Sequence, residues 1–140
     1  MTTESHKRYA VDYDWYEVRN RSLATALLTR LCPSCREERV ASDDVEALAA
    51  TIVECCAQNR GFITQYTPIR EAVFRLLLAW GNQPLSAAEI CDELRGRMAF
   101  SLRTATLTPE SIARLLDNDN YYGIRPVAEA AVAEPEEEAA

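Results

Sequence analysis

Four cysteines in the first half of the chain carry the strongest chemical signal in these 140 residues. Cys32 and Cys35 are separated by a proline and a serine, and two thiols at this spacing can wrap both sulfurs round one metal ion. Cys55 and Cys56 follow and can complete a set of four sulfurs. The N-terminus is polar and resembles neither a secretory signal nor a transit peptide. We therefore expect a soluble cytoplasmic protein with a metal site rather than a disulfide framework.

Zinc is the expected metal, bound by thiolates so that it joins the end of one helix to the end of another. Cys32, Cys35 and Cys55 supply three ligands. The candidates for the fourth ligand are Cys56, the single histidine His6, and the fifth cysteine, Cys91. An iron–sulfur cluster, unligated structural thiols and thioredoxin-like redox chemistry are the alternatives. The usual ferredoxin spacings and a surrounding βαβ pattern are absent, which favours zinc.

The adjacent pair Cys55 and Cys56 places a condition on the helix that carries it. Successive side chains of an α-helix point about 100° apart, so two adjacent cysteines can ligate one ion only if the helix unwinds at its end. Gly61 lies a few residues further on and favours such an ending. Without unwinding, Cys56 lies in the middle of the apolar stripe of the helix, as an ordinary buried thiol.

Hydrophobic periodicity predicts a mainly α protein with five helices. The expected ranges are about 14–31, 42–58, 67–80, 86–94 and 108–116, and the last four helices have Ser42, Thr67, Ser86 and Thr108 as N-caps. Alternating side chains at residues 9–15 predict an extended segment, and residues 121–125 predict a short strand. The protein is thus expected to contain one or two short strands beside its helices.

The helix expected over 67–80 is apolar on two nearly opposite sides. One side carries Ile69, Val73, Leu76, Leu77 and Trp80, and the other carries Phe74 and Leu78. A helix of this kind is buried between two layers. We therefore expect one compact domain over residues 1–125, in which this helix joins a cysteine-bearing half (1–61) to a C-terminal half (62–125).

The last fifteen residues differ in composition from the rest of the chain. They contain five glutamates and no lysine or arginine, so the net charge of −7 falls to −2 when residues 126–140 are left out. Alanine, glutamate and proline cannot bury enough apolar surface to offset the entropy of ordering. Residues 126–140 are expected to form a disordered, solubilising acidic tail.

The stretch from Val73 to Leu94 resembles the opening of winged helix-turn-helix domains. It contains a hydrophobic helix, the turn Gly-Asn-Gln-Pro-Leu-Ser, and a capped helix with the sequence Ala-Glu-Ile-Cys-Asp-Glu-Leu. The resemblance extends over roughly residues 68–125. It implies that the next helix, from Pro109 to Leu116, reads DNA.

Four arginines are the candidate contacts for nucleic acid: Arg95, Arg97, Arg103 and Arg114. The first three lie in a stretch, 95–108, that contains no acidic residue, and Phe100 in the same stretch could supply a stacking surface. Arg114 is the one arginine of the candidate recognition helix. The alternative for the 95–108 stretch is a solvated loop.

No catalytic constellation is apparent, because His6 has no visible carboxylate or nucleophile partner and no glycine-rich phosphate loop is present. We therefore expect a protein without enzymatic activity. The expected function is a zinc-stabilised regulatory or accessory module of nucleic-acid or transcription machinery. The alternative is a protein–protein adaptor that binds no nucleic acid. A protein partner is expected in either case, without a membrane or a small-molecule substrate.

Overall fold

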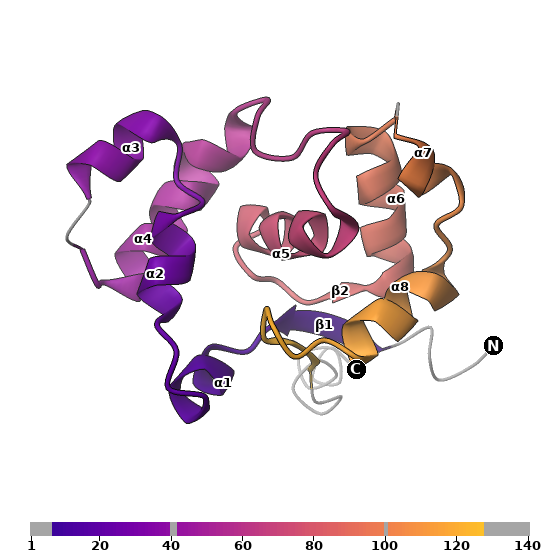
Figure 1. The fold of residues 1–140 in the computed structure, drawn as a ribbon, viewed down its shortest axis with the longest axis horizontal. Helices are drawn as coiled ribbons and strands as arrows, with labels where there is room; N and C mark the ends of the chain where they lie inside the picture. Colours follow the sequence, from indigo (N-terminus) through magenta and orange to yellow (C-terminus); the bar gives the residue numbers. More distant parts are fainter. Residues whose placement is uncertain (1–6, 40–41, 100, 128–140) are drawn as a thin grey trace, which may run out of the picture.

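Three short strands join both ends of the chain to its middle in the computed structural model, which describes residues 7–39, 42–99 and 101–127. β1 (Arg8–Val11), β2 (Leu85–Ser86) and β3 (Ile124–Pro126) form one sheet in the order β2–β1–β3. Helices make up most of the remaining structure (Figure 1): α1 (Tyr13–Val18), α2 (Leu23–Leu28), α3 (Pro33–Glu38), α4 (Val45–Glu54), the 3₁₀ helix η2 (Cys56–Gln58), α5 (Ile69–Ala79), α6 (Ala87–Arg97), α7 (Leu102–Ala105) and α8 (Pro109–Asp117). The prediction of a mainly helical protein is confirmed. None of the helices in these ranges is long and apolar enough to cross a membrane.

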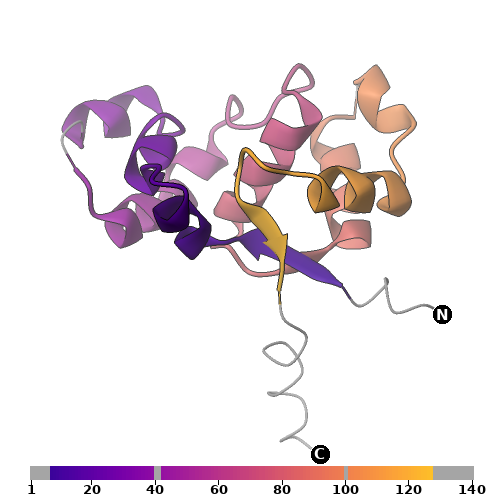
Figure 2. The ribbon, with the colours of Figure 1, turned by 60° about the horizontal axis from the view of Figure 1, so that its bottom comes forward.

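β1 lies in the middle of the sheet and runs antiparallel to both neighbours. Tyr9 and Val11 of this strand are buried, whereas Arg8 and Ala10 are half-buried, as the alternation of a strand requires. The backbone N–H of Val127 donates a hydrogen bond to the carbonyl of Arg8 at 2.8 Å. The two ends of the described chain therefore leave the sheet beside each other (Figure 2).

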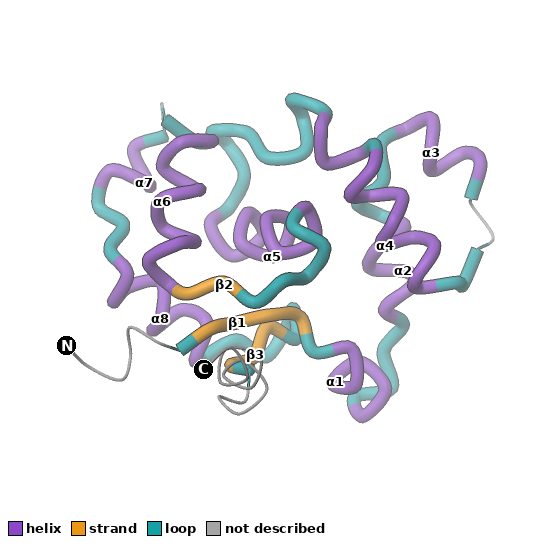
Figure 3. Tube along the Cα trace, turned by 180° about the vertical axis from the view of Figure 1, so that it is seen from behind, coloured by secondary structure: helices purple, strands orange, loops and turns teal. Residues whose placement is uncertain are grey.

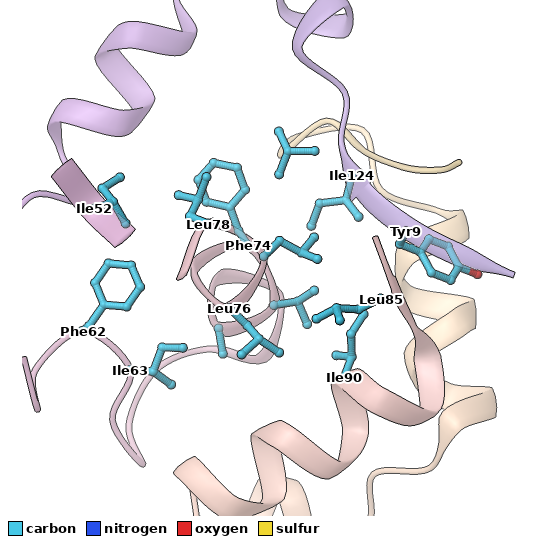
Figure 4. Close-up of a cluster of buried hydrophobic side chains, with 14 of the residues drawn as sticks. Tyr9, Ile52, Phe62, Ile63, Phe74, Leu76, Leu78, Leu85, Ile90 and Ile124 are labelled. Atoms are coloured by element: carbon cyan, nitrogen blue, oxygen red, sulfur yellow. The ribbon is translucent and has the colours of Figure 1, made fainter. Parts of the chain in front are cut away.

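α5 runs through the centre of the molecule, between α2 and α4 on one side and α6 and α8 on the other (Figure 3). Its buried residues are Ala72, Val73, Phe74, Leu76, Leu77 and Leu78. Ile52 and Phe62 lie on one side of this helix in the core, and Leu85 and Ile90 lie on the other (Figure 4). The two-sided burial predicted for this helix is found over residues 72–78, whereas Trp80, also expected on one apolar side, is exposed. One hydrophobic cluster contains residues from both halves of the chain.

The helix expected over 14–31 is interrupted. α1 ends at Val18, and the chain turns through Asn20, which has a φ of 59° in the left-handed region. Ser22 then caps α2, because its hydroxyl accepts a hydrogen bond from the N–H of Thr25 at 3.0 Å. Asparagine tolerates positive φ and serine is a strong N-cap, so these local signals outweigh the helical periodicity.

The remaining expected helices are found with changes at their ends. Ser86 and Thr108 are N-caps with capping boxes, as predicted. Ser42 is not an N-cap, since the carboxylate of Asp44 caps α4, and α5 begins one residue later than expected, after Pro68. α3 and α7 are additional short helices inside segments expected to be loops, so the described chain does not match the five-helix prediction.

A tight turn precedes β3, so the strand expected over 121–125 starts only at Ile124. The carboxylate of Asp119 accepts three hydrogen bonds of 3.1, 3.0 and 2.9 Å from the backbone N–H groups of Tyr121, Tyr122 and Ile124. Gly123 has a φ of 74°, and a Cβ at this position would lie 2.8 Å from the rings of Trp15 and Tyr16. Only glycine fits there.

The acidic tail expected from residue 126 overlaps the sheet. Pro126 belongs to β3, so the boundary at 125 is wrong by at least one residue. The remainder of the expected tail, 128–140, lies outside the described residues, as does His6.

Three charged side chains connect the cysteine-bearing half to α5. Both carboxylate oxygens of Glu71 accept hydrogen bonds from Arg30, at 2.8 and 2.9 Å, and Oε2 also accepts one from Arg75 at 2.7 Å. Arg75 in turn donates to the carbonyl of Phe62 at 2.9 Å. Burial alone would raise the pKa of Glu71, but the hydrogen bonds and charges of both arginines hold it below its usual value.

Candidate metal centre

The first two cysteines lie at the start of α3. Cys32 is the N-cap residue, Pro33 occupies the first turn, and Cys35 is buried one turn further on. Proline suits this position because its fixed φ matches a helix and its missing N–H has no partner there. The guanidinium of Arg36 donates to the carbonyls of Thr29, at 2.8 Å, and Leu31, at 3.5 Å, which fixes the chain just before Cys32.

The other two cysteines lie where α4 ends. α4 stops at Glu54, Cys55 leaves the helical region with φ −134° and ψ −64°, and Cys56 begins η2. This break turns the two adjacent side chains toward the same point. The unwinding that joint ligation requires is therefore present, although the helix was expected to continue to Gln58.

The four sulfurs lie close enough together to surround one ion. The Sγ of Cys55 is 3.6 Å from that of Cys35 and 4.0 Å from that of Cys32. All four Sγ atoms lie within 4.8 Å of one another. Zn–S bonds of about 2.3 Å place the sulfurs of a tetrahedral site about 3.8 Å apart, so the observed spacings fit such a site.

The cysteines are free thiols in the structure, and their surroundings shift the pKa values of the individual thiols in different directions. Hydrogen bonds from the backbone N–H of Cys35 and from Ser34 lower the pKa of Cys32 to about 6. Contacts with the thiols of Cys35 and Cys32 raise the pKa of Cys55 to about 11, and burial raises that of Cys56 to about 12. Thiolates this close repel one another, and a bound cation removes that repulsion.

Backbone and hydroxyl groups orient the sulfurs from outside the cluster. The N–H of Cys32 donates to the Sγ of Cys56 at 3.2 Å, and the hydroxyl of Ser34 lies 3.7 Å from the Sγ of Cys32. Such contacts fix ligands before a metal arrives. Ser34 and Arg36 were not predicted to belong to the site, although both lie within or directly after the Cys-Pro-Ser-Cys stretch. Ser34 contacts a candidate ligand, and Arg36 holds the backbone just before Cys32.

The two other candidates for the fourth ligand are not part of this group. Cys91 is buried on α6 and does not join the four sulfurs, and His6 is outside the described residues. The structure thus brings together Cys32, Cys35, Cys55 and Cys56.

The candidate nucleic-acid contacts are spread over α6, α7 and α8. Arg95 donates to the carbonyl of Leu107, and Arg97 pairs with Glu93 at 3.5 Å. Arg114 is exposed on α8. Arg103 belongs to α7, but its side chain is not described, and Phe100 lies outside the described residues.

Four protein sulfurs complete a tetrahedron and leave no position for water or substrate, which is the arrangement of metal sites that stabilise a fold. Comparison of the chain with protein-family models, with curated proteins and with solved structures finds no match.

Proposed function

We propose that Cys32, Cys35, Cys55 and Cys56 bind one structural Zn²⁺ as thiolates. The observation that carries this proposal is the single group of four Sγ atoms within 4.8 Å of one another. The ion would hold the start of α3 against the end of α4. The N–H of Cys32 already donates to the Sγ of Cys56 across this junction, and a metal bound there would add its binding free energy to that of folding.

An iron–sulfur cluster fits this group less well than a single ion. A [4Fe–4S] cluster binds its four thiolates through four different iron atoms, so its ligands lie farther apart than those of one tetrahedral ion. The thiols here approach to 3.6 Å, which suits a mononuclear site. A single iron ion bound by four thiolates remains the competing occupant, and its colour distinguishes it from zinc.

Elemental analysis of protein purified anaerobically tests the metal directly. We expect about one equivalent of zinc per chain. The Cys32→Ser variant should lose most of it, whereas the control Cys91→Ser, which alters a thiol outside the group, should keep it. Metal-free wild-type protein would contradict the proposal. Iron in the purified protein, with absorbance at about 400 nm, would show that the bound metal is iron and not zinc.

For the C-terminal half of the chain, we propose a winged-helix-like unit built from residues 68–126 together with β1. In winged-helix domains a short strand follows the first helix, and the two strands of a hairpin follow the third. Here β2 follows α5 and β3 follows α8, while β1 takes the place of the second hairpin strand between them. The hairpin loop is thereby replaced by the two ends of the chain.

The proposed role is a non-enzymatic accessory module of nucleic-acid machinery, in which the zinc serves the fold. The winged-helix-like order of elements supports this role, and α8 occupies the place of the helix that reads DNA. Arg114 is the arginine of α8, and no carboxylate in residues 7–39, 42–99 and 101–127 forms an ion pair with it. Arg103 on α7 is a second candidate contact.

A protein–protein adaptor is the second candidate, favoured by the contacts of two of the arginines. Arg95 donates to the carbonyl of Leu107 and Arg97 is paired with Glu93, so both would have to share or exchange these contacts to bind phosphate.

Salt dependence of binding decides between the two roles. If nucleic acid binds, fluorescence anisotropy with duplex DNA and single-stranded RNA should show affinity that falls several-fold between about 50 and 200 mM salt, because each phosphate contact releases counterions. Neutralising Arg95, Arg97, Arg103 and Arg114 should weaken binding, and removing residues 128–140 should strengthen it. Absence of binding to both probes at the lower salt, with and without that segment, would favour the adaptor.

A further inference from the structure

A hollow of about 360 Å³ lies between α2 and the turn that precedes β3, away from the four cysteines. Tyr16, Phe74, Tyr121 and Tyr122 supply aromatic walls to it. α2 contributes Ser22, Thr25 and Thr29 along one side. No carboxylate is among the lining residues, and the volume is within the usual range for small-ligand sites.

Arg21 is a fixed cation at this hollow. Its guanidinium stacks over the rings of Tyr121, Trp15 and Tyr16, at 4.8, 5.3 and 5.7 Å from their centroids. One of its nitrogens donates to the carbonyl of Tyr121 at 2.9 Å. Among the described residues no carboxylate forms an ion pair with it. Its remaining N–H groups are thus held in place and available to an anion.

The other arginine of the hollow has a different role. Arg30 is bound to Glu71, but it shares that one carboxylate with Arg75, so the three side chains together keep one net positive charge. Arg21 adds a second, unpaired charge directly at the hollow. A phosphate monoester, which carries up to two negative charges, matches this environment.

Two hydroxyl groups on the α2 side can bind polar atoms of a ligand. The oxygen of Ser22 accepts the N–H of Thr25, which leaves its own O–H free to donate. The hydroxyl of Thr25 has no partner among the described residues, and its side chain is exposed. By contrast, the hydroxyl of Thr29 is used, since it donates to Ala26 and accepts from Arg30.

These features fit a flat ring with polar edges joined to one anionic group. The ring of Tyr121 contacts the guanidinium of Arg21 and forms an edge-to-face pair with Tyr122, with 4.8 Å between the ring centroids, yet Tyr121 is still 57% exposed. A base can stack on the part of the ring that these two contacts leave open. A phenyl ring would leave the hydroxyls of α2 without partners, whereas a nucleobase has donors and acceptors for them. We propose that this hollow binds a nucleoside monophosphate unit, with its phosphate on Arg21 and its base between Tyr121 and the hydroxyls of α2.

The unit can be a free nucleotide or one residue of a single strand, since the chemistry is shared. Isothermal titration of the full chain, as purified, with AMP, UMP, inorganic phosphate and a short oligouridylate separates these sources. We expect AMP or UMP to bind with a Kd of about 1 mM or tighter and inorganic phosphate to bind more weakly. Tighter binding of the oligouridylate than of UMP identifies the strand as the source, and equal or weaker binding identifies the free nucleotide.

Variants of the lining residues test where the nucleotide binds. Arg21→Gln should weaken nucleotide binding about tenfold or more, because it removes a charge-assisted hydrogen bond. Tyr121→Ala should weaken it about fivefold or more through lost stacking, and Thr25→Val should weaken it without altering the charge. The matched control is Arg60→Gln, an exposed arginine that does not line the hollow.

Circular dichroism of each variant shows whether it is folded. If Arg21→Gln is not folded, Thr25→Val, a change at an exposed position, still tests the site. Absence of nucleotide binding would overturn the proposal. Equal affinity for AMP and inorganic phosphate, or equal losses in Arg21→Gln and Arg60→Gln, would also overturn it. The experiment uses neither the metal content nor Arg95, Arg97, Arg103 and Arg114, so its failure leaves the proposed function standing.

Discussion

Replacing Cys35 by serine should remove the metal and lower the free energy of unfolding by more than about 4 kcal/mol. The Sγ of Cys35 is 3.6 Å from that of Cys55, so these two sulfurs lie close together within the group of four cysteines. A whole domain is stable by only about 5–15 kcal/mol, so this loss should bring the variant close to unfolding at room temperature. Thermal denaturation under reducing, anaerobic conditions with equimolar zinc measures the effect.

The matched control is Cys91→Ala, which removes a buried thiol that is outside the group. It should cost far less and leave the zinc content unchanged. A chelator should lower the melting temperature of the wild type toward that of Cys35→Ser and should have little further effect on the variant. Equal melting temperatures of Cys35→Ser and Cys91→Ala would contradict the proposed zinc site.

The shape of the same melting curves tests whether the chain is one domain. Because α5 is buried on both sides and one hydrophobic cluster contains residues of both halves, we expect a single transition monitored by far- and near-ultraviolet dichroism alike. Separate transitions, with only the first sensitive to chelator, would indicate two independent halves.

The group of four cysteines is the feature that the sequence indicated most directly, because its signals are local. Two cysteines three positions apart can bring their sulfurs close together within one short turn of the chain. A Cys-Cys pair followed by a glycine a few residues later is consistent with a helix that ends at the pair. The choice of Cys56 over His6 or Cys91 was left open, since it depends on how α4 meets the start of α3. Sequence periodicity contains no information on that contact.

The sheet and the hollow show what local patterns do not contain. An extended segment at residues 9–15 was predicted, and only its first part is a strand, since β1 ends at Val11 and α1 begins at Tyr13. The pairing of β1 with β2 and β3 joins positions far apart in the chain. Likewise, Arg21 and Tyr121 are 100 positions apart, and their contact forms only when the turn held by Asp119 lies against α1 and α2. Side chains that meet across such distances are set by packing of the whole core.

Replacing Glu71 by glutamine should cost about 3 kcal/mol at neutral pH, because it leaves two partly buried guanidinium groups without their shared counter-ion. The side chains of Glu71 and Arg30 are each only 15% exposed, so solvent screens their interaction weakly. The matched control is Glu93→Gln, which breaks the more exposed pair with Arg97 and should cost about 0.5 kcal/mol or less.

The pH dependence of this difference distinguishes the ion pairs from simple packing. Because the folded-state pKa of Glu71 is depressed, its contribution is fully present above the usual glutamate value, about 4.3, and is lost as the pH falls through the lower folded-state pKa. The difference in free energy of unfolding between wild type and Glu71→Gln should therefore be constant from about pH 7 to 5 and should shrink below about pH 4. Urea denaturation at each pH measures it, with the Glu93→Gln control measured in parallel, so that acid release of metal affects all three proteins alike. A difference that persists unchanged at the lowest pH would mean that Glu71 stabilises the core through its shape and hydrogen bonds and not through its charge.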